Sequence, residues 1–282
     1  CPCQERLVCS EAVEGGHLEV LQWAYARECP IDAETCTAAA AGGFLEVLQW
    51  ARSVDCPWNA EACSLAAKAG HLEVLRWALA HGCPRDGEAL AGAAYYGHEA
   101  CVRLLLETGS DPDDFDDEGQ TPLMNAARQG HVGCARALLA AGASPHRADE
   151  EGQTALMHAC RAGRAACAAV LLRTGVAAGQ ANDAGWTALF SACTSGDEAC
   201  TRLLVGHGCA LDAVCSEGGE QARSTPLIAA AAKGHEACVR VLLAAGADPS
   251  VVVDGDTAFA RARANGHDTV ADILLARAGG VG

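Results

Sequence analysis

A glycine that recurs at a regular interval limits how this chain can fold more than any other feature of its sequence. The glycine is followed by histidine or a substitute and stands at Gly16, Gly43, Gly70, Gly97, Gly130, Gly163, Gly196, Gly234 and Gly266. Successive glycines are separated by 27, 27, 27, 33, 33, 33, 38 and 32 residues. Self-similarity at periods of roughly 20–50 residues is typical of arrays whose units bury their apolar faces only against their neighbours. We therefore expect stacked units along the whole chain.

Each unit has the composition and the start signals of short helices. Hydrophobic residues make up 50% of the chain but aromatic residues only 4%. The core must therefore be built from small side chains at close helix spacing, which favours helices over sheets. A threonine opens the first helix in five units, at Thr121, Thr154, Thr187, Thr225 and Thr257. Its hydroxyl can cap the helix, and Pro122 and Pro226 fit the first helical position.

The 33-residue units share one pattern, which from Asp117 reads DEGQTPLMNAARQGHVGCARALLAAGASP and returns from Asp149 and from Asn182. Over residues 97–282 this pattern resembles the ankyrin repeat. The resemblance implies an all-α fold, an α-solenoid of stacked helix-turn-helix ankyrin repeats with β-hairpin fingers mainly in the C-terminal half. The family's usual histidine after Thr-Pro-Leu is replaced by Met124, Met157, Phe190, Ile228 and Ala260. We therefore expect a more hydrophobic stack that lacks the polar network of the family.

The units before residue 97 are shorter and resemble the family less closely. They lack six residues at the place of the finger that separates ankyrin units. We therefore divide the chain into residues 1–112, with short 27-residue ankyrin-like repeats, and residues 113–282, with 33-residue-type repeats that end in a capping repeat. Residues 214–223 lengthen one unit and are expected to form a longer, mobile loop. Because the chain begins at Cys1 and its first unit has no polar cap, we expect earlier repeats to precede it.

Most of the 17 cysteines follow the repeat; Cys1, Cys3 and Cys215 do not. The others stand where further units have valine, leucine, alanine or serine, so we interpret them as small buried hydrophobic residues. Equivalent cysteines of adjacent units should lie about 8–10 Å apart, beyond the roughly 7 Å between Cα atoms that a disulfide spans. Periodic disulfides are therefore not expected, and a reducing compartment, cytoplasmic or nuclear, fits better. Cys1, Cys3 and Cys9 come nearest to a metal cluster, but paired C-x-x-C spacing is absent and no metal site is predicted.

No motif indicates catalysis or a cofactor. The sequence contains neither a glycine-rich phosphate-binding loop nor a nucleophile elbow. Two histidine-glutamate pairs, at residues 98–99 and 235–236, begin like the zinc-protease motif H-E-x-x-H, but valine replaces the second histidine. His146, His158 and Cys215 are the only scattered candidates for chemistry. We predict that the chain is not an enzyme.

Four tryptophans fall on repeat positions. Trp23, Trp50 and Trp77 recur every 27 residues where other units carry leucine or valine, so they are expected in the core. Trp186 stands at the base of a finger, where other units carry glutamine. It either forms a binding hot spot on the concave side or packs on the neighbouring finger, and both interpretations stay open.

The charge balance excludes some partners. The formal net charge is -16, from 36 acidic and 20 basic residues, which suits neither nucleic acid nor an anionic membrane. No uninterrupted apolar run approaches the roughly 18 residues of a membrane span. We expect a monomer.

Resemblance to ankyrin proteins implies a non-catalytic protein-protein interaction scaffold that binds a partner protein through the concave surface of fingers and first helices. By analogy with the family, this surface comprises Asp117, Glu118, Gln120, Arg128, Gln129, Glu150, Glu151, Gln153, Arg161, Asp183, Trp186, Thr194 and Ser195. Its acidic fingertips suggest a partner with a basic surface, although a merely solvated edge would have the same composition. The alternative function is a substrate-recruiting adaptor or regulatory region of a larger multidomain protein.

Overall fold

The computed structural model describes residues 9–182, 184–216 and 223–278, which belong to two compact units. The first unit comprises residues up to 126 together with 133–143, and the second comprises 127–132 together with the residues from 144 onwards. The predicted change of repeat type between residues 112 and 113 lies within the first unit. No helix in the described ranges combines the length and the apolar character that a membrane span needs.

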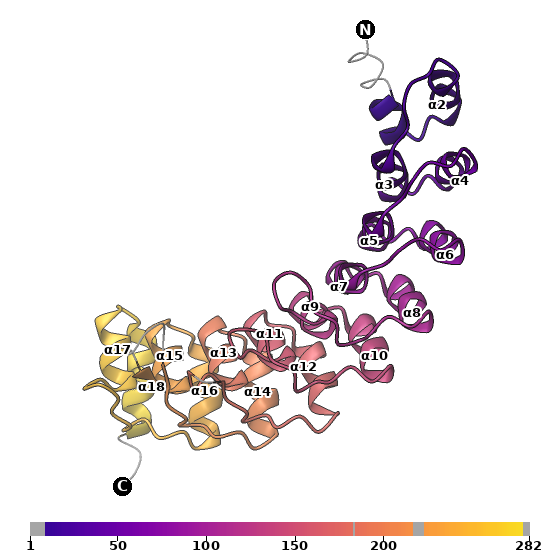
Figure 1. The fold of residues 1–282 in the computed structure, drawn as a ribbon. Coiled ribbons are helices and arrows are strands. Elements are labelled where there is room, and N and C mark those ends of the chain that lie inside the picture. Colours follow the sequence, from indigo (N-terminus) through magenta and orange to yellow (C-terminus); the bar gives the residue numbers. More distant parts are fainter. Residues whose placement is uncertain (1–8, 183, 217–222, 279–282) are drawn as a thin grey trace. The chain divides into compact units, whose positions relative to one another are not determined.

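In the first unit, the first helices of successive repeats form one row and the second helices form another (Figure 1). The described chain begins with a helical segment at residues 9–14, followed by α2 (Leu18–Tyr25). The first-helix row continues with α3 (Ala33–Ala41), α5 (Ala60–Lys68) and α7 (Gly87–Tyr96). The second-helix row continues with α4 (Leu45–Ser53), α6 (Leu72–Ala80) and α8 (Glu99–Glu107). The next repeat contains α9 (Pro122–Gln129), which ends in the second unit, and α10 (Val132–Ala140).

The second unit has the same two rows (Figure 1). Its first helices are α11 (Ala155–Arg161), α13 (Ala188–Ser195), α15 (Pro226–Ala232) and α17 (Ala258–Ala264). Its second helices are α12 (Ala165–Leu172), α14 (Glu198–Gly206), α16 (Glu236–Ala245) and α18 (Asp268–Ala278). The predicted all-α solenoid of helix-turn-helix repeats is therefore confirmed.

The fingers of the second unit are minimal hairpins. Isolated antiparallel bridges join residues 148 and 154, 181 and 187, and 253 and 256. At the expected longer loop, β1 (Cys215–Ser216) pairs antiparallel with β2 (Arg223–Ser224). Short strands thus hold both ends of the insertion, and residues 217–222 lie outside the described part.

Threonine capping starts the first helices of the longer repeats, as predicted. The backbone N–H of Met157 donates to Thr154 Oγ1 at 3.4 Å, and that of Phe190 donates to Thr187 Oγ1 at 3.1 Å. Each bond satisfies a donor that would otherwise lack a partner in the first turn of the helix, which stabilises a cap by about 1 kcal/mol.

The core consists of small side chains on the first helices and leucines on the second. Ala66, Ala93 and Leu75 are fully buried in the first unit, as are Ala192 and Leu204 in the second. All cysteines in the described ranges are buried as well, which agrees with their interpretation as small hydrophobic residues. Small first-helix residues allow neighbouring repeats to approach closely, so each repeat completes the core of the next.

The tryptophans of the short repeats lie on the outside of the second helices, and the prediction that they form the core is wrong. Trp23 is 54% exposed, and Trp50 and Trp77 are only partly buried. The Trp50 ring meets Tyr25 edge-on at 5.7 Å between centroids, and Trp77 stacks on His81 at 4.1 Å. An indole is larger than the leucine or valine that fills this place elsewhere, so it extends along the surface and packs against other rings.

One disulfide was not foreseen from the sequence. Cys9 and Cys29 are bonded to each other, although each had been interpreted only as a packing residue. The expectation concerned equivalent cysteines of adjacent repeats, whereas this bond joins two positions within one repeat. The bond also weakens the inference of a reducing compartment, since that inference rested on unpaired cysteines.

Truncating the two kinds of second-helix side chain should have different effects on stability. Leu75→Ala removes a fully buried side chain, which lowers the free energy of unfolding by about 2–5 kcal/mol. Trp23→Ala removes an exposed ring, and surface changes usually cost less than about 1 kcal/mol. Urea unfolding followed by far-UV circular dichroism measures both, and equal losses would contradict the outward position of Trp23.

Candidate functional site

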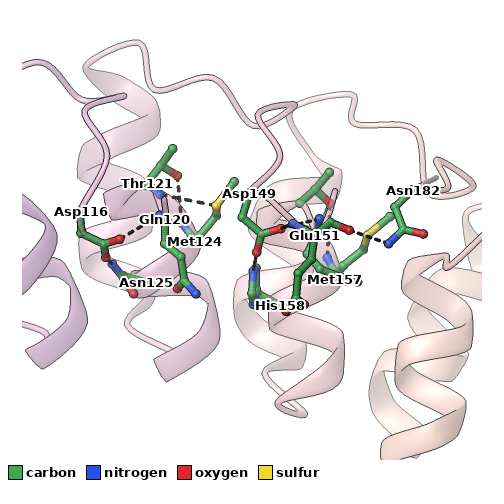
Figure 2. Close-up of polar contacts among 12 residues, drawn as sticks. Asp116, Gln120, Thr121, Met124, Asn125, Asp149, Glu151, Met157, His158 and Asn182 are labelled. Atoms are coloured by element: carbon green, nitrogen blue, oxygen red, sulfur yellow. Dashed lines mark hydrogen bonds and ion pairs between the residues drawn. The ribbon is translucent and has the colours of Figure 1, made fainter. Parts of the chain in front are cut away.

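The bases of three fingers are each shaped by one polar side chain at the same repeat position, namely Asp116, Asp149 or Asn182. Asp149 Oδ1 accepts the backbone N–H groups of Glu151 at 3.1 Å and Gln153 at 2.7 Å (Figure 2). Asn182 Oδ1 accepts those of Ala184 at 3.1 Å and Trp186 at 2.8 Å. These bonds replace water around a tight turn and fix its conformation.

The turns also require glycine. Gly152 has φ +72° and Gly185 has φ +78°, in the left-handed region that other residues rarely adopt. The polar side chain and the glycine together set the direction in which each finger leaves the first helix.

A polar network is present, contrary to the expectation from the missing family histidine, and it lies one residue further along. In the first unit, Asn125 Nδ2 donates to Asp116 Oδ2 at 2.7 Å. In the second unit, His158 Nε2 donates to Asp149 Oδ2 at 2.8 Å (Figure 2). The residue after Met124 or Met157 thus ties the first helix to the finger base, while the methionine enters the core.

In the third repeat with this pattern, Asn182 stands at the position of Asp116 and Asp149 and makes a different second hydrogen bond. Asn182 has no second carboxylate oxygen, and its Nδ2 instead donates to the backbone oxygen of Glu151 at 2.9 Å (Figure 2). This bond links two successive fingers of the second unit. Ser191 occupies the position of His158, and its buried Oγ has no hydrogen-bond partner among the described residues.

His158 is a buried histidine that is neutral near pH 7. The His158 and Asp149 side chains are each 7% exposed. Burial lowers the pKa of His158, and the positive charges of Arg128 and Arg161 act in the same direction. The hydrogen bond with Asp149 raises that pKa but does not outweigh the loss of solvation. The imidazole therefore serves as a neutral donor to Asp149.

A groove of about 740 Å³ runs over the finger bases and the first helices of the second unit. It is lined by Glu151, Gln153, Arg161, Asn182, Ala184, Trp186, Thr194, Ser195 and Lys233. Six of these residues were predicted as binding residues from the sequence, so the structure gathers much of the predicted surface into one place. Arg161 comes from the end of α11, the two hydroxyl residues from the end of α13, and Lys233 from just beyond α15.

Lys233 is a groove residue that the sequence reasoning missed. Two residues of the predicted surface, Gln129 and Ser195, directly precede a repeat glycine, and Lys233 holds the same position before Gly234. This shared position before the repeat glycine is the sequence signal that identifies Lys233. Its side chain is exposed.

Trp186 packs in the core and also lines the groove. Its ring meets Phe190 edge-on at 4.9 Å between centroids and packs against a buried cluster that includes Cys215 and Ala229. The same half-buried side chain lines the groove. Its contact in the core therefore holds an aromatic surface in place at the groove wall.

The hydroxyl groups of the groove already have backbone partners. Thr194 Oγ1 donates to the Ser191 oxygen at 2.9 Å, and Ser195 Oγ lies 3.2 Å from the Cys160 oxygen. The second contact ties α13 to α11. These side chains form a fixed floor, whereas the charged groups project freely.

None of the other predicted residues that the structure describes lines the groove. Asp117, Glu118 and Glu150 are exposed on fingers, whereas Gln120 is 9% exposed and is a buried residue. The partly buried residues Arg128 and Gln129 lie at the end of α9, and Asp183 lies outside the described residues.

The scattered candidates for chemistry are not assembled into a catalytic site. His158 is committed to Asp149, and the buried Cys215 Sγ donates to the Gly185 oxygen at 2.8 Å. His146 lies exposed near a finger. Across the described ranges, histidine, cysteine and carboxylate side chains form no group of three or more that could hold a metal ion.

Stacked helix pairs joined by short fingers define a repeat solenoid, and the comparisons identify its family. The sequence model for ankyrin repeats, in three copies, matches residues 9–116, 63–149, 141–215 and 213–281. The chain therefore belongs to the ankyrin repeat family, whose members are generally protein-protein interaction modules and typically non-catalytic.

A solved structure supports the same assignment. The crystal structure of the human ASB11 ankyrin repeat domain matches with a TM-score of 0.67 and 27% sequence identity, covering 76% of this chain and 96% of that chain. No curated protein matched the chain.

His158 should make stability depend on pH. Below about pH 6.5 the unfolded state takes up a proton that buried His158 resists, so the free energy of unfolding falls until the pH passes the lower folded pKa. His158→Asn keeps a donor for Asp149, as Asn125 provides for Asp116, but does not titrate. Unfolding measured between about pH 7 and pH 5 should therefore show a shallower decline in the variant. Identical pH profiles would contradict a depressed pKa.

Proposed function

We propose that this chain is a non-catalytic interaction scaffold that binds an extended segment of a partner protein in the groove of the second unit. The observation that carries the proposal is a set of unpaired charges and an aromatic wall on a fixed floor. Glu151, Arg161 and Lys233 line the groove, and none of the three forms an ion pair within the described residues. Trp186 provides the aromatic surface.

Arginines on the outer face of the same unit, in contrast, form ion pairs within the chain. Arg202 pairs with Glu198 on α14, and Arg240 pairs with Glu236 on α16 at 2.8 Å. Charges that are already paired gain little from a partner, whereas Arg161 and Lys233 are available for one. This contrast favours the groove as the binding face.

The groove chemistry describes the partner. Arg161 and Lys233 suit acceptor groups such as a carboxylate or backbone carbonyls, and Trp186 suits an apolar or aromatic side chain. The exposed carboxylates of Glu150 and Glu151 on the neighbouring finger suit basic residues beside that segment. A partner meets all of these conditions if an acidic or polar segment enters the groove and basic residues lie on the partner surface beside that segment.

Charge reversal in the groove tests the binding face. The probe is a peptide selected on the wild-type chain from a displayed library. Arg161→Glu with Lys233→Glu should lower the affinity for this peptide at least about tenfold, or 1.4 kcal/mol. Arg202→Glu with Arg240→Glu makes the same charge change on the outer helices and is the matched control. Isothermal titration calorimetry measures both, after circular dichroism has shown equal folding. Equal weakening by the two double variants would refute a groove-specific site.

Acidic fingers should act mainly on the rate of association. Glu150→Gln with Glu151→Gln should lower the association rate constant at low salt and flatten its dependence on ionic strength, because salt screens exposed charges beyond about 10 Å at 0.1 M. Stopped-flow or surface-based kinetics over a salt series measures this. A wild-type rate that ignores salt would show that the acidic edge is only solvated.

The proposal has further parts that follow from composition. A net charge of -16 supports a chain that binds neither nucleic acid nor an anionic membrane, and we propose a monomer in the cytoplasm or nucleus. A second candidate role is a substrate-recruiting adaptor or regulatory region of a larger multidomain protein. The matched human structure favours it, since that structure is of an ankyrin repeat domain.

A further inference from the structure

Three pairs of cysteines recur at one spacing in the short repeats. The first pair is Cys9 and Cys29, the second is Cys36 and Cys56, and the third is Cys63 and Cys83, each separated by 20 residues. In each pair one cysteine lies on the first helix of a repeat and the other lies in the loop after the second helix. Since the repeats are equivalent, the state of one pair is a guide to the other two.

The structure bonds the first pair and brings the other two pairs into contact. Cys9 and Cys29 form a disulfide. In the second pair and in the third pair, the two thiols lie close enough for each to shift the pKa of the other. These four cysteines are free thiols. Contact between two thiol groups is the starting geometry for a bond between them.

The loop cysteine is held at the same place in both reduced pairs. Cys56 Sγ donates to the Asp32 oxygen at 3.0 Å, and Cys83 Sγ donates to the Asn59 oxygen at 3.5 Å. Asp32 and Asn59 each stand directly before the first helix of the same repeat. The loop thiol is thus aimed at the start of the helix that carries its partner.

Packing alone does not require cysteine at these positions. In a later repeat the same two positions hold Leu123 and Ala143, and in the next they hold Leu156 and Val176. Those apolar side chains are also buried. A leucine with a small partner therefore fills the space, and the paired thiols of the short repeats add a reactivity that the apolar pairs lack.

The two thiols of a pair differ in acidity. The hydrogen bond from Cys36 lowers the pKa of the Cys56 thiol, and the nearby Arg52 guanidinium acts in the same direction. The same hydrogen bond, together with burial, raises the pKa of the Cys36 thiol. The third pair shows the same division, with the loop cysteine as the more acidic thiol. Thiolates are the nucleophiles in disulfide exchange, so the loop cysteine reacts first.

We propose that the second and third pairs are dithiol modification sites, each of which closes to an intrarepeat disulfide when a low-molecular-weight disulfide such as oxidised glutathione is present. The Cys56 thiolate attacks one glutathione sulfur, and the other glutathione leaves as a thiolate that takes a proton. Cys36 then loses its proton to solvent and attacks the Cys56 sulfur, which releases the second glutathione. One glutathione disulfide is reduced to two thiols as one protein dithiol is oxidised.

The fold gives the oxidant a route to the loop thiol. Cys56 is buried, but its neighbours Asp55 and Pro57 are exposed, so a local opening of this loop uncovers the sulfur. Closure would tie the first helix of a repeat to the loop that ends it. That link restricts the unfolded chain and stabilises the repeat against unfolding.

Disulfide mapping on the full chain tests the proposal. The reduced protein is equilibrated in glutathione buffers with a rising share of the oxidised form, quenched with acid, unfolded, alkylated and digested without reductant for mass spectrometry. Peptides that link Cys36 to Cys56 and Cys63 to Cys83 should form, with loss of alkylation at all four. Cys101, whose pKa is raised by burial, should stay fully alkylated.

A matched variant separates chemistry from packing. Cys36→Leu with Cys56→Ala copies the residues at positions 123 and 143, so it keeps an apolar pair while it removes both thiols. Oxidation should raise the midpoint of thermal unfolding more in the wild type than in this variant, while the third pair still closes in both. Stable glutathione adducts on Cys56 without closure, links between different repeats, or four thiols that stay reduced would each overturn the proposal.

Discussion

Close contact between the first helices of successive repeats is the interaction on which the rest of this structure depends. Alanine and cysteine at the contact positions are fully buried, as Ala66, Ala93 and Ala192 show. A single pair of short helices buries too little apolar surface to fold alone, so each repeat is stable only because its neighbours cover it. Because the same contact recurs from repeat to repeat, finger bases and cysteine pairs stand at equivalent places in successive repeats.

Polar bonds at the finger base hold the edge of this stack in one conformation. Asp149 and Asn182 fix the turns, and the Asn182 bond to Glu151 joins two fingers into one edge. The edge-on contact with the buried Phe190 ring holds the Trp186 ring in place. A surface held in place before binding loses little conformational freedom when a partner arrives, which is how a rigid scaffold gains affinity.

Particular residues show how far the sequence could be read. The threonine caps, the helix pairs and the buried cysteines followed from local chemistry and period, whereas six of the groove residues were named only by the resemblance to ankyrin repeats. Trp77 was misplaced because periodicity reports which positions are equivalent, but not whether a larger ring fits the space of a leucine. The polar network was missed because Asn125 and His158 stand one residue away from the family's position. Their partners, Asp116 and Asp149, lie nine residues earlier.

The sequence by itself determined the period, the helix starts and the small-residue core, because these depend on each residue and its near neighbours in the chain. Only the tertiary structure decided which side chains come together: the neutral imidazole of His158 with Asp149, Lys233 and Trp186 in one groove, and Cys9 with Cys29. These contacts depend on how turns and neighbouring repeats bring distant positions within a few ångströms. The burial and the pKa of a side chain depend on this assembled environment, because the stack as a whole excludes solvent and brings charges together.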